Sequence, residues 1–568
     1  MRKILQRTVR KVLKARALSA QTAAAAAAAA AMFTITTIVA GAQTLTVRSS
    51  TDPNVVITVP DYSDRILTPK APDTPRINGP KVYGARPKAD FIYRIPTTGV
   101  RPITFYAEGL PKGLKLDKEK GIITGKVKKA GVYHVTLKAE NAFGSFEKDF
   151  RIVIGDKIAL TPPLGWNSWN CWGNTVTQEL IESSAEAMVK SGLADYGWSY
   201  INIDDGWQGL RGGKYNAIQP NRKFPDMKAL ADAIHAEGLK FGIYSGPWVS
   251  TYASHIGSSC DNPEGTYWWV EKGWVNENMR LDRSKLGKEE IRYFGKYSFA
   301  RQDARQWADW GVDYLKYDWN PNDEWWIRDM KEALDATGRD IVYSISNSSR
   351  VSMGPVLLKY ADCWRTTGDI RDTWESMSTI GFKGQDKWAG YREVGRWPDA
   401  DMLVLGKVGW GRKDHWTQLT PDEQFTHISL WAILASPMLL GCDMAMLDDF
   451  TLSLLCNSEV LDVNQDPLGV QATRHEYTDS TITYVKPLED GSLAVGLFNI
   501  SETPQTMGFT CHKLGLLGTQ TVRDLWRQKD IAKIAQKERW ETEVAPHGVV
   551  LLRLYPGNSG EKLEGDWR

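Results

Sequence analysis

The sequence predicts a (β/α)8 barrel flanked by an amino-terminal β-sandwich and a carboxyl-terminal antiparallel β-sandwich. Between residues 162 and 462, short apolar strands alternate with helical patterns, whereas the segments on either side show only short alternating runs typical of antiparallel sheets. An open nucleotide-binding sheet would need a phosphate-binding loop, and none is found, so a closed barrel is favoured. The eight candidate strands lie at residues 164–168, 200–204, 240–245, 312–317, 340–345, 362–365, 402–405 and 437–441.

The first 42 residues have the order of a secretory signal peptide. Seven basic side chains lie among the first 16 residues, an alanine-rich apolar stretch follows, and Ala40, Gly41 and Ala42 precede a cleavage site before Gln43. We expect an exported protein, periplasmic or extracellular, without stable membrane insertion after cleavage. A transmembrane anchor is the alternative, but the stretch is only weakly apolar. Removal of the seven charges from 70 leaves 63 basic against 68 acidic residues, about −5, which argues against nucleic-acid binding.

Composition divides the rest of the chain into four parts. Residues 43–80 are rich in proline, aspartate and threonine and are interpreted as a linker or edge segment. Residues 81–157 contain a hairpin pattern and no cluster of catalytic residue types, which indicates an immunoglobulin-like β-sandwich with a spacer or binding role. Residues 158–468 form the predicted catalytic barrel, and residues 469–568 form the second sandwich.

Two helices and one insertion of the barrel can be placed from local signals. A capping box at Thr175 and Gln178 predicts a helix that stops at Gly192, and a second helix over residues 299–310 stops at Gly311. Residues 246–296 form a long insertion after the third strand. Because loops after barrel strands lie on the catalytic face, its aromatic residues are expected to shape the rim of a pocket. They are Trp248, Tyr252, Tyr267, Trp268, Trp269 and Trp274.

The composition gives no sign of a metal or cofactor. Eight histidines show none of the spacings of metal sites, and the six cysteines contain no C-x-x-C pair, although one or two disulfides remain possible outside the cytoplasm. The chain has 24 tryptophans, which either stack on sugar rings or fill a large core.

Acidic side chains recur at the predicted carboxyl ends of the strands. These ends meet at one face of a barrel, so acids distant in sequence become neighbours there. Helix capping explains one or two such acids, and for Asp318 alone it is as good an explanation as catalysis. The acids are Asp204 and Asp205 after strand two, Asp318 at the end of strand four, Asp369 after strand six, and Asp399 and Asp401 before strand seven.

Opposed carboxylates among further acids and aromatic residues suit the cleavage of a glycosidic bond. Lys316 and Asp318 project from the same side of their strand, so the lysine should keep the aspartate ionised as a nucleophile. Asp369 suits the acid/base role, because its neutral neighbours Thr366, Thr367 and Gly368 should let its pKa rise.

Five ordered motifs resemble the α-galactosidases of glycoside hydrolase family 27. The resemblance covers about residues 161–554 and implies a retaining mechanism with Asp318 as nucleophile and Asp369 as acid/base, without metal or cofactor. It also implies that galactose is bound by Asp204, Asp205, Tyr244, Lys316, Arg365 and Asp401, with Trp169 lining the pocket. The motifs lie at residues 164–169, 202–207, 315–318, 364–369 and 399–403.

Two positions depart from the family pattern. Ser346 stands where many α-galactosidases have a glutamate that faces the sugar 2-hydroxyl, and a serine there resembles the related α-N-acetylgalactosaminidases. Pro398 and Ala400 replace a usual asparagine and proline, which changes loop stiffness more than chemistry.

The leading hypothesis is an exported α-galactosidase acting on oligosaccharides or polysaccharide side chains. α-N-Acetylgalactosaminidase and β-L-arabinopyranosidase are alternatives, although Asp205 favours galactose because it leaves room for the C6 hydroxymethyl group. A non-catalytic carbohydrate-binding protein would be expected to lack one of the two central acids.

Overall fold

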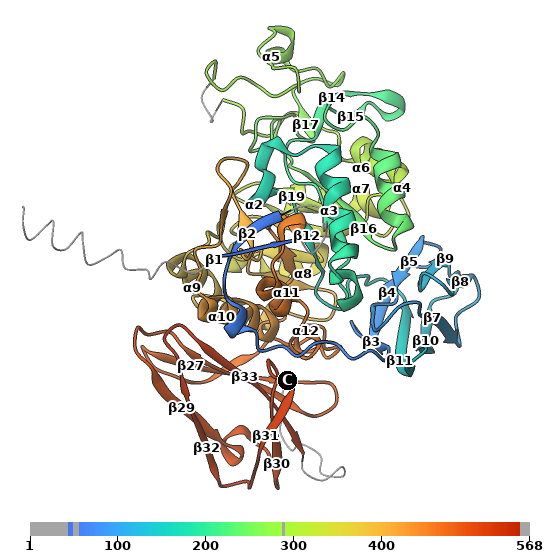
Figure 1. Cartoon of the computed structure of the whole chain (residues 1–568). Helices are drawn as coiled ribbons and strands as arrows, with labels where there is room; N and C mark the ends of the chain where they lie inside the picture. Colours follow the sequence, from blue (N-terminus) through green and yellow to red (C-terminus); the bar gives the residue numbers. More distant parts are fainter. Residues whose placement is uncertain (1–43, 49–55, 287–289, 557–568) are drawn as a thin grey trace, which may run out of the picture.

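A closed parallel sheet of eight strands forms the centre of the molecule, in the order β22-β21-β20-β19-β16-β13-β12-β25 (Figure 1). Leu403 forms a parallel bridge with Leu440 that brings the two ends of this sheet together, so the predicted (β/α)8 barrel is confirmed. This computed structural model describes residues 44–48, 56–286 and 290–556. The strands are β12 (Leu164–Asn167), β13 (Tyr200–Asn202), β16 (Lys240–Ser245), β19 (Tyr314–Asp318), β20 (Val342–Ser346), β21 (Cys363–Arg365), β22 (Trp397–Asp399) and β25 (Met438–Leu440).

The seventh strand differs from its prediction. It is β22, whereas residues 402–405 are buried but make only the single bridge at Leu403. Residues 402–405 are apolar because they are buried, not because they form a hydrogen-bonded ladder. The true strand was missed because it contains Pro398, and proline, which lacks an amide donor, argues against a central strand. Asp399 therefore ends the strand and Asp401 follows it, as at the other acid-bearing strands.

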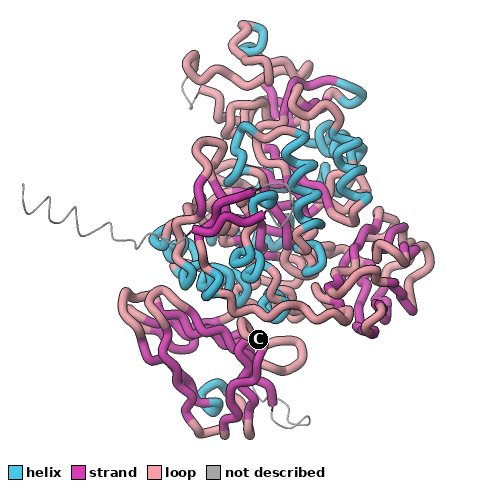
Figure 2. The backbone as a smooth tube through the Cα atoms, in the orientation of Figure 1, coloured by secondary structure: helices cyan, strands magenta, loops and turns pink. Residues whose placement is uncertain are grey.

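Helices cover the outside of the barrel (Figure 2). The first long helix after β12 is α3 (Gln178–Lys190), and it is capped by Thr177, whose hydroxyl accepts the Leu180 amide at 3.4 Å. The cap predicted at Thr175 lies instead in the preceding 3₁₀ turn. The helix before β19 ends at Gly311 in the left-handed conformation, as predicted. The main helices are α3 (Gln178–Lys190), α4 (Met227–Ala236), α6 (Ala300–Trp310), α7 (Glu324–Asp335), α8 (Gly354–Tyr360), α9 (Trp374–Phe382), α10 (Pro421–Ile433), α11 (Asp449–Leu455) and α12 (Ser458–Asn464). Two single-turn helices are α2 (Trp169–Trp172) and α5 (Trp268–Glu271).

Tryptophan fills much of the barrel core. Nine tryptophans are less than 2% exposed, so the high tryptophan content is explained mainly by packing. All six cysteines are free, and five of them are buried, so no disulfide contributes to stability.

The amino-terminal module is a small β-sandwich that packs on the base of the barrel (Figure 1). Arg86 pairs with Asp340 at 2.7 Å, and Arg94 donates to the Glu237 carbonyl at 2.9 Å. Lys240, the first residue of β16, contacts the Tyr83 hydroxyl. These barrel residues lie at the amino ends of the strands, so the module is at the end opposite the strand-end acids. Its strands are β3 (Arg76–Ile77), β4 (Val82–Ala85), β5 (Phe91–Arg94), β6 (Thr97–Thr98), β7 (Thr104–Glu108), β8 (Leu114–Asp117), β9 (Ile122–Gly125), β10 (Gly131–Asn141) and β11 (Gly144–Ile154).

The segment predicted as a linker or edge carries a hairpin of β1 (Thr44–Arg48) and β2 (Val56–Pro60). The indole of Trp416 donates to the Thr58 carbonyl at 3.1 Å, which ties the hairpin to the barrel. The predicted signal peptide lies outside the described residues.

The carboxyl-terminal sandwich consists of a six-stranded sheet and a two-stranded sheet, as predicted. Nowhere in the described ranges is a helix long and apolar enough to cross a membrane. The sandwich strands are β26 (Thr473–Tyr477), β27 (Thr481–Pro487), β28 (Leu493–Asn499), β29 (Gln505–Thr510), β30 (Gln520–Asp524), β31 (Lys529–Ile534), β32 (Arg539–Val544) and β33 (Val549–Pro556).

Candidate active site

Asp318 lies buried at the carboxyl end of β19 and accepts two hydrogen bonds. The Tyr244 hydroxyl, from β16, donates to one carboxylate oxygen at 3.1 Å, and the Asn347 amide, just after β20, donates to the other at 3.3 Å. Burial raises the pKa of Asp318 to about 7, and this effect outweighs the opposing charge of Lys316. Lys316 favours the ionised form, as the sequence suggested, but burial opposes it more strongly, so the pKa of Asp318 lies above its ordinary value in the free protein.

Lys316 is paired with Asp204 rather than with Asp318. Its ammonium lies 2.7 Å from an Asp204 oxygen, and both side chains are largely buried. Burial alone would lower the pKa of Lys316, but Asp204 and Asp318 raise it above its usual range. The Asp204 amide donates to the Ser168 hydroxyl at 2.9 Å, which fixes the end of strand two against strand one. The lysine is thus a permanent cation between two carboxylates.

Asp205 is held by the long insertion that follows β16. Its oxygens accept the Thr251 hydroxyl at 2.8 Å and the Ala253 amide at 2.6 Å. Burial raises the pKa of Asp205 to about 6, although both hydrogen bonds act in the opposite direction. The insertion therefore sets the position of this side chain.

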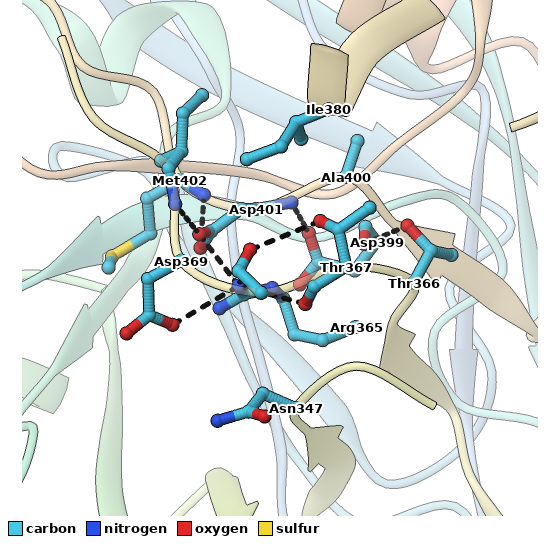
Figure 3. A network of polar contacts seen from close by, with 12 residues as sticks. Asn347, Arg365, Thr366, Thr367, Asp369, Ile380, Asp399, Ala400, Asp401 and Met402 are labelled. Carbon is cyan, nitrogen blue, oxygen red and sulfur yellow. Dashed lines mark hydrogen bonds and ion pairs between the residues drawn. The ribbon is translucent and has the colours of Figure 1, made fainter. Parts of the chain in front are cut away.

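Arg365 connects the remaining two acids (Figure 3). Its guanidinium lies 2.7 Å from Asp401 and 3.3 Å from Asp369, and it donates to the Gly368 carbonyl at 2.7 Å. Asp401 also accepts the amides of Ile370 and Met402 at 2.8 and 2.7 Å. Burial raises the pKa of Asp401 to about 6 against the charge of Arg365. The Asp401 side chain is 2% exposed and that of Asp369 is 60% exposed, so only Asp369 is free to meet a ligand from solvent.

The pKa of Asp369 does not rise as the sequence suggested. Burial raises it, but the charge of Arg365, then that of Lys316, and the hydrogen bond from Arg365 lower it below its usual value in the free protein. The neutral residues adjacent in sequence matter less than the arginine four residues earlier, because Arg365 points back toward the loop.

The two other predicted site residues line the same end of the barrel. Ser346 pairs in register with Asp318 on the adjacent strand, so both side chains project from the same side of the sheet. Trp169 begins α2 directly after strand one and packs partly buried against the cluster inside the barrel that includes Met402. All ten predicted site residues therefore belong to the carboxyl ends of the strands or to the loops that follow them.

Asn347 and Tyr252 lie near the proposed nucleophile and were not among the predicted site residues. Tyr252, from the insertion, interacts with the Asn347 amide, and burial together with the Asp318 charge raises its pKa to about 12. The guanidinium of Arg292 stacks over the Tyr252 ring at 4.5 Å. The sequence carried a signal for both, because Tyr252 lies in an aromatic-rich insertion and Asn347 directly follows a barrel strand. Within the described ranges, no three histidine, cysteine or acidic side chains are grouped so that they could hold a metal ion.

Three family models match the chain, in the order of its structural parts. The model described as Alpha galactosidase A matches residues 161–267 and 283–466, which includes every predicted site residue. The alpha galactosidase C-terminal beta sandwich domain matches residues 478–554, and a putative Ig domain matches residues 74–155.

Known proteins resemble most of the chain. An α-galactosidase from Cyamopsis tetragonoloba is 36% identical over 414 residues, which are 72% of this chain and 89% of that protein. A Bacteroides fragilis structure described as a candidate α-galactosidase/melibiase is 36% identical with a TM-score of 0.74, and covers 85% of this chain and 98% of its own. A GH27 β-L-arabinopyranosidase from Geobacillus stearothermophilus is 29% identical with a TM-score of 0.61, and covers 70% of this chain and 98% of its own. The chain therefore belongs to the α-galactosidase A family of glycoside hydrolases, family 27.

Proposed function

We propose that the protein is a retaining α-galactosidase, which removes terminal non-reducing α-D-galactosyl units from oligosaccharides or polysaccharides by double displacement. The observation that carries the proposal is the arrangement of Asp318 and Asp369. One carboxylate is buried and held by Tyr244 and Asn347, and the other is exposed at the mouth and held by Arg365.

In the first step, ionised Asp318 attacks the anomeric carbon while protonated Asp369 gives its proton to the glycosidic oxygen. The bond to the leaving sugar breaks, and a covalent galactosyl-enzyme forms. Asp369 must gain a proton for this step, and the docked leaving group supplies the physical cause. It covers a side chain that is 60% exposed, and loss of water raises a carboxyl pKa.

In the second step, Asp369 takes a proton from water, and the resulting hydroxide attacks the anomeric carbon from the face that the leaving group vacated. The bond to Asp318 breaks, so two inversions give net retention. Lys316, Asp204 and Arg365 surround the site with fixed charges that need no rearrangement during the reaction.

Two contacts favour galactose over the alternative sugars. Asn347 directly follows Ser346 and donates to Asp318, so its side chain takes up space on the Ser346 side, where a 2-acetamido group would need room. Asp205 is buried and fixed by Thr251 and Ala253, which suits recognition of the C6 hydroxyl that arabinopyranose lacks. Ser346 remains the observation that favours α-N-acetylgalactosaminidase as the second candidate.

A panel of nitrophenyl glycosides of α-galactose, α-N-acetylgalactosamine and β-L-arabinopyranose tests the sugar. We expect the largest kcat/KM on α-galactoside, and a dominant rate on either other sugar would replace the substrate while leaving the mechanism intact.

The stereochemistry of the product tests the mechanism separately. Proton NMR of the first-formed sugar should show the α anomer, because retention preserves the configuration. An initial β anomer would contradict double displacement. Asp318→Asn should reduce kcat by at least about a thousandfold on any glycoside, since the attacking group is lost.

Export to the periplasm or the exterior is a further part of the proposal, supported by the basic and apolar order of residues 1–42. Amino-terminal sequencing of the protein recovered from outside the cytoplasm should begin at Gln43. Recovery of the full-length chain from the cytoplasm alone would contradict it.

A further inference from the structure

Trp325 is unusual among the tryptophans of this chain because its side chain is open to solvent. It is 48% exposed, whereas every other tryptophan in the described ranges is buried or only partly exposed. An exposed indole ring does not contribute the hydrophobic free energy that the buried tryptophans contribute to folding, so the position of Trp325 calls for another explanation.

The ring belongs to an aromatic ledge made of Trp325, Trp326 and Phe294. Trp326 is the buried member of the ledge, and its ring centroid lies 4.4 Å from that of Trp325 at an interplanar angle of 78°. Phe294, 40% exposed, stacks on the other side of Trp326 at 4.9 Å and 12°. Trp325 and Trp326 begin α7, and Phe294 comes from the returning end of the long insertion. Two separate segments thus fix the exposed rings, which lowers the entropy that a ligand would have to remove.

The ledge is joined to the candidate active site through the short segment between Asp318 and α7, on the face of the barrel where the strands end. The segment between Asp318 and α7 is braced against the loop after β20, because Asn320 donates to the Asn347 carbonyl and Asn322 to the Ser346 carbonyl, each at 3.0 Å. Asp323 then caps α7 by accepting the Trp326 amide at 3.2 Å. The segment that leaves the nucleophile therefore leads directly to Trp325 and is held in place by the loop that carries Asn347.

We propose that the aromatic ledge binds further sugar rings of a polymeric substrate, next to the galactosyl unit held at Asp318. The inference rests on the proposed function and names its substrate class, a polysaccharide with α-galactosyl side units. Sugar rings present apolar faces that stack on indole, and the exposed polar residues Asn320 and Glu324 beside the ring supply hydrogen-bond partners. A second copy of this chain is the rival occupant, and the short connection from Asp318 to the ledge favours the glycan.

Kinetics on two substrates test the ledge. In Trp325→Ala, KM for a galactose-substituted β-mannan should rise about tenfold, while kcat/KM for nitrophenyl α-galactoside should stay within about twofold of wild type. Phe294→Ala should show the same pattern more weakly. Tyr477→Ala, which removes a 67% exposed aromatic ring on the carboxyl-terminal sandwich, is the matched control and should change neither value. Unchanged kinetics on the polymer in Trp325→Ala would overturn the proposal, as would an equal loss on both substrates.

A binding assay separates failure of the ledge from failure of the proposed function. Asp318→Asn should be retarded by the same polysaccharide in affinity electrophoresis, and the double variant with Trp325→Ala should be retarded clearly less. Equal retardation of the two proteins overturns the ledge even if the wild type hydrolyses α-galactosides. If nitrophenyl α-galactoside is not hydrolysed by the wild type, the function fails while this assay still decides the ledge. A halved mass of Trp325→Ala in sedimentation, with retardation unchanged, would assign the ring to a dimer instead.

Discussion

At the scale of single residues, the site separates two carboxylates by their surroundings. Asp318 is 8% exposed and receives hydrogen bonds from two neutral donors, whereas the Asp369 side chain is 60% exposed and lies beside Arg365. The free protein therefore holds its proton preferentially at Asp318, which is the reverse of the distribution that the first chemical step needs. In the proposed mechanism, substrate binding reverses this order of the two pKa values. The order in the free enzyme can be measured through the titration of Asp318.

The pH dependence of kcat/KM should respond to the charge of Asp369. Asp318 must be ionised to attack, so activity on a substrate with a good leaving group should fall as the pH drops through about 7. Asp369 raises the pKa of Asp318, so Asp369→Asn should move this acidic limb to lower pH. α-Galactosyl fluoride is the appropriate substrate because its departure does not require the general acid. An acidic limb that stays in place or moves upward would show that Asp318 is not the titrating group.

The stability of the fold should also depend on the charge of Asp318. The aspartate ionises near pH 4 when unfolded but at about 7 when folded, so its ionised form increasingly destabilises the native state between these values. Asp318→Asn, neutral at every pH, should therefore be more stable than wild type by on the order of 2 kcal/mol at pH 8, with a smaller gain at pH 5. Urea unfolding at both pH values measures this difference. A gain that shrinks toward high pH would contradict the assigned burial.

At the scale of elements, the insertion after β16 is part of the site. It delivers Thr251, Ala253 and Tyr252, which reach Asp205 and Asn347 from the opposite side of the mouth. The insertion therefore fixes the position of Asp205, to which the proposed function assigns recognition of the sugar C6 hydroxyl.

Removal of one of these bonds should weaken discrimination between two sugars. Thr251→Val keeps the shape of the side chain but deletes the hydroxyl that donates to Asp205. We expect kcat/KM on α-galactoside to fall about tenfold, with a smaller fall on β-L-arabinopyranoside, which has no C6 hydroxyl. Thr266→Val, an exposed position in the same insertion, is the control and should have no effect. Equal losses on both sugars would mean that Asp205 does not sense C6.

At the scale of the whole molecule, the amino-terminal module packs against the end of the barrel that lies away from the candidate active site. It meets the amino ends of the strands, while the acids lie at their carboxyl ends. Arg86 is the main connection, with ion pairs to Asp335 and Asp340 at 2.8 and 2.7 Å.

Loss of Arg86 should uncouple the module without affecting catalysis. Arg86→Ala should lower the midpoint of thermal unfolding, because it removes about 1–3 kcal/mol of charged hydrogen bonds and leaves Asp340, within the described ranges, with only the backbone amide of residue 86 as a donor. Hydrolysis of nitrophenyl α-galactoside at 25 °C should remain at the wild-type rate. Lys126→Ala removes an exposed ion pair with Asp90 within the same module, and calorimetry should find it close to wild type. A loss of activity in Arg86→Ala at 25 °C would mean that the base of the barrel is coupled to the site.

The sequence by itself determined the barrel and the face on which its chemistry lies. Alternating strands and helices require parallel strands, and parallel strands in a barrel end at one face, so Asp204, Asp318, Asp369 and Asp401 had to meet there. The helix end at Gly311 followed equally from local backbone preference.

Only the tertiary structure decided which groups pair. Lys316 forms its ion pair with Asp204 instead of with Asp318, which is nearer in the sequence. The charge of Arg365 lowers the pKa of Asp369. Such pairings depend on distances between side chains from different strands, which local sequence does not encode. The seventh strand was misplaced for a related reason, since burial gave residues 402–405 the pattern of a strand although they form a single bridge to Leu440 and no ladder. The contact of Asn347 with Asp318, the contact of Tyr252 with Asn347 and the exposure of Trp325 likewise became visible only once the loops were folded against one another.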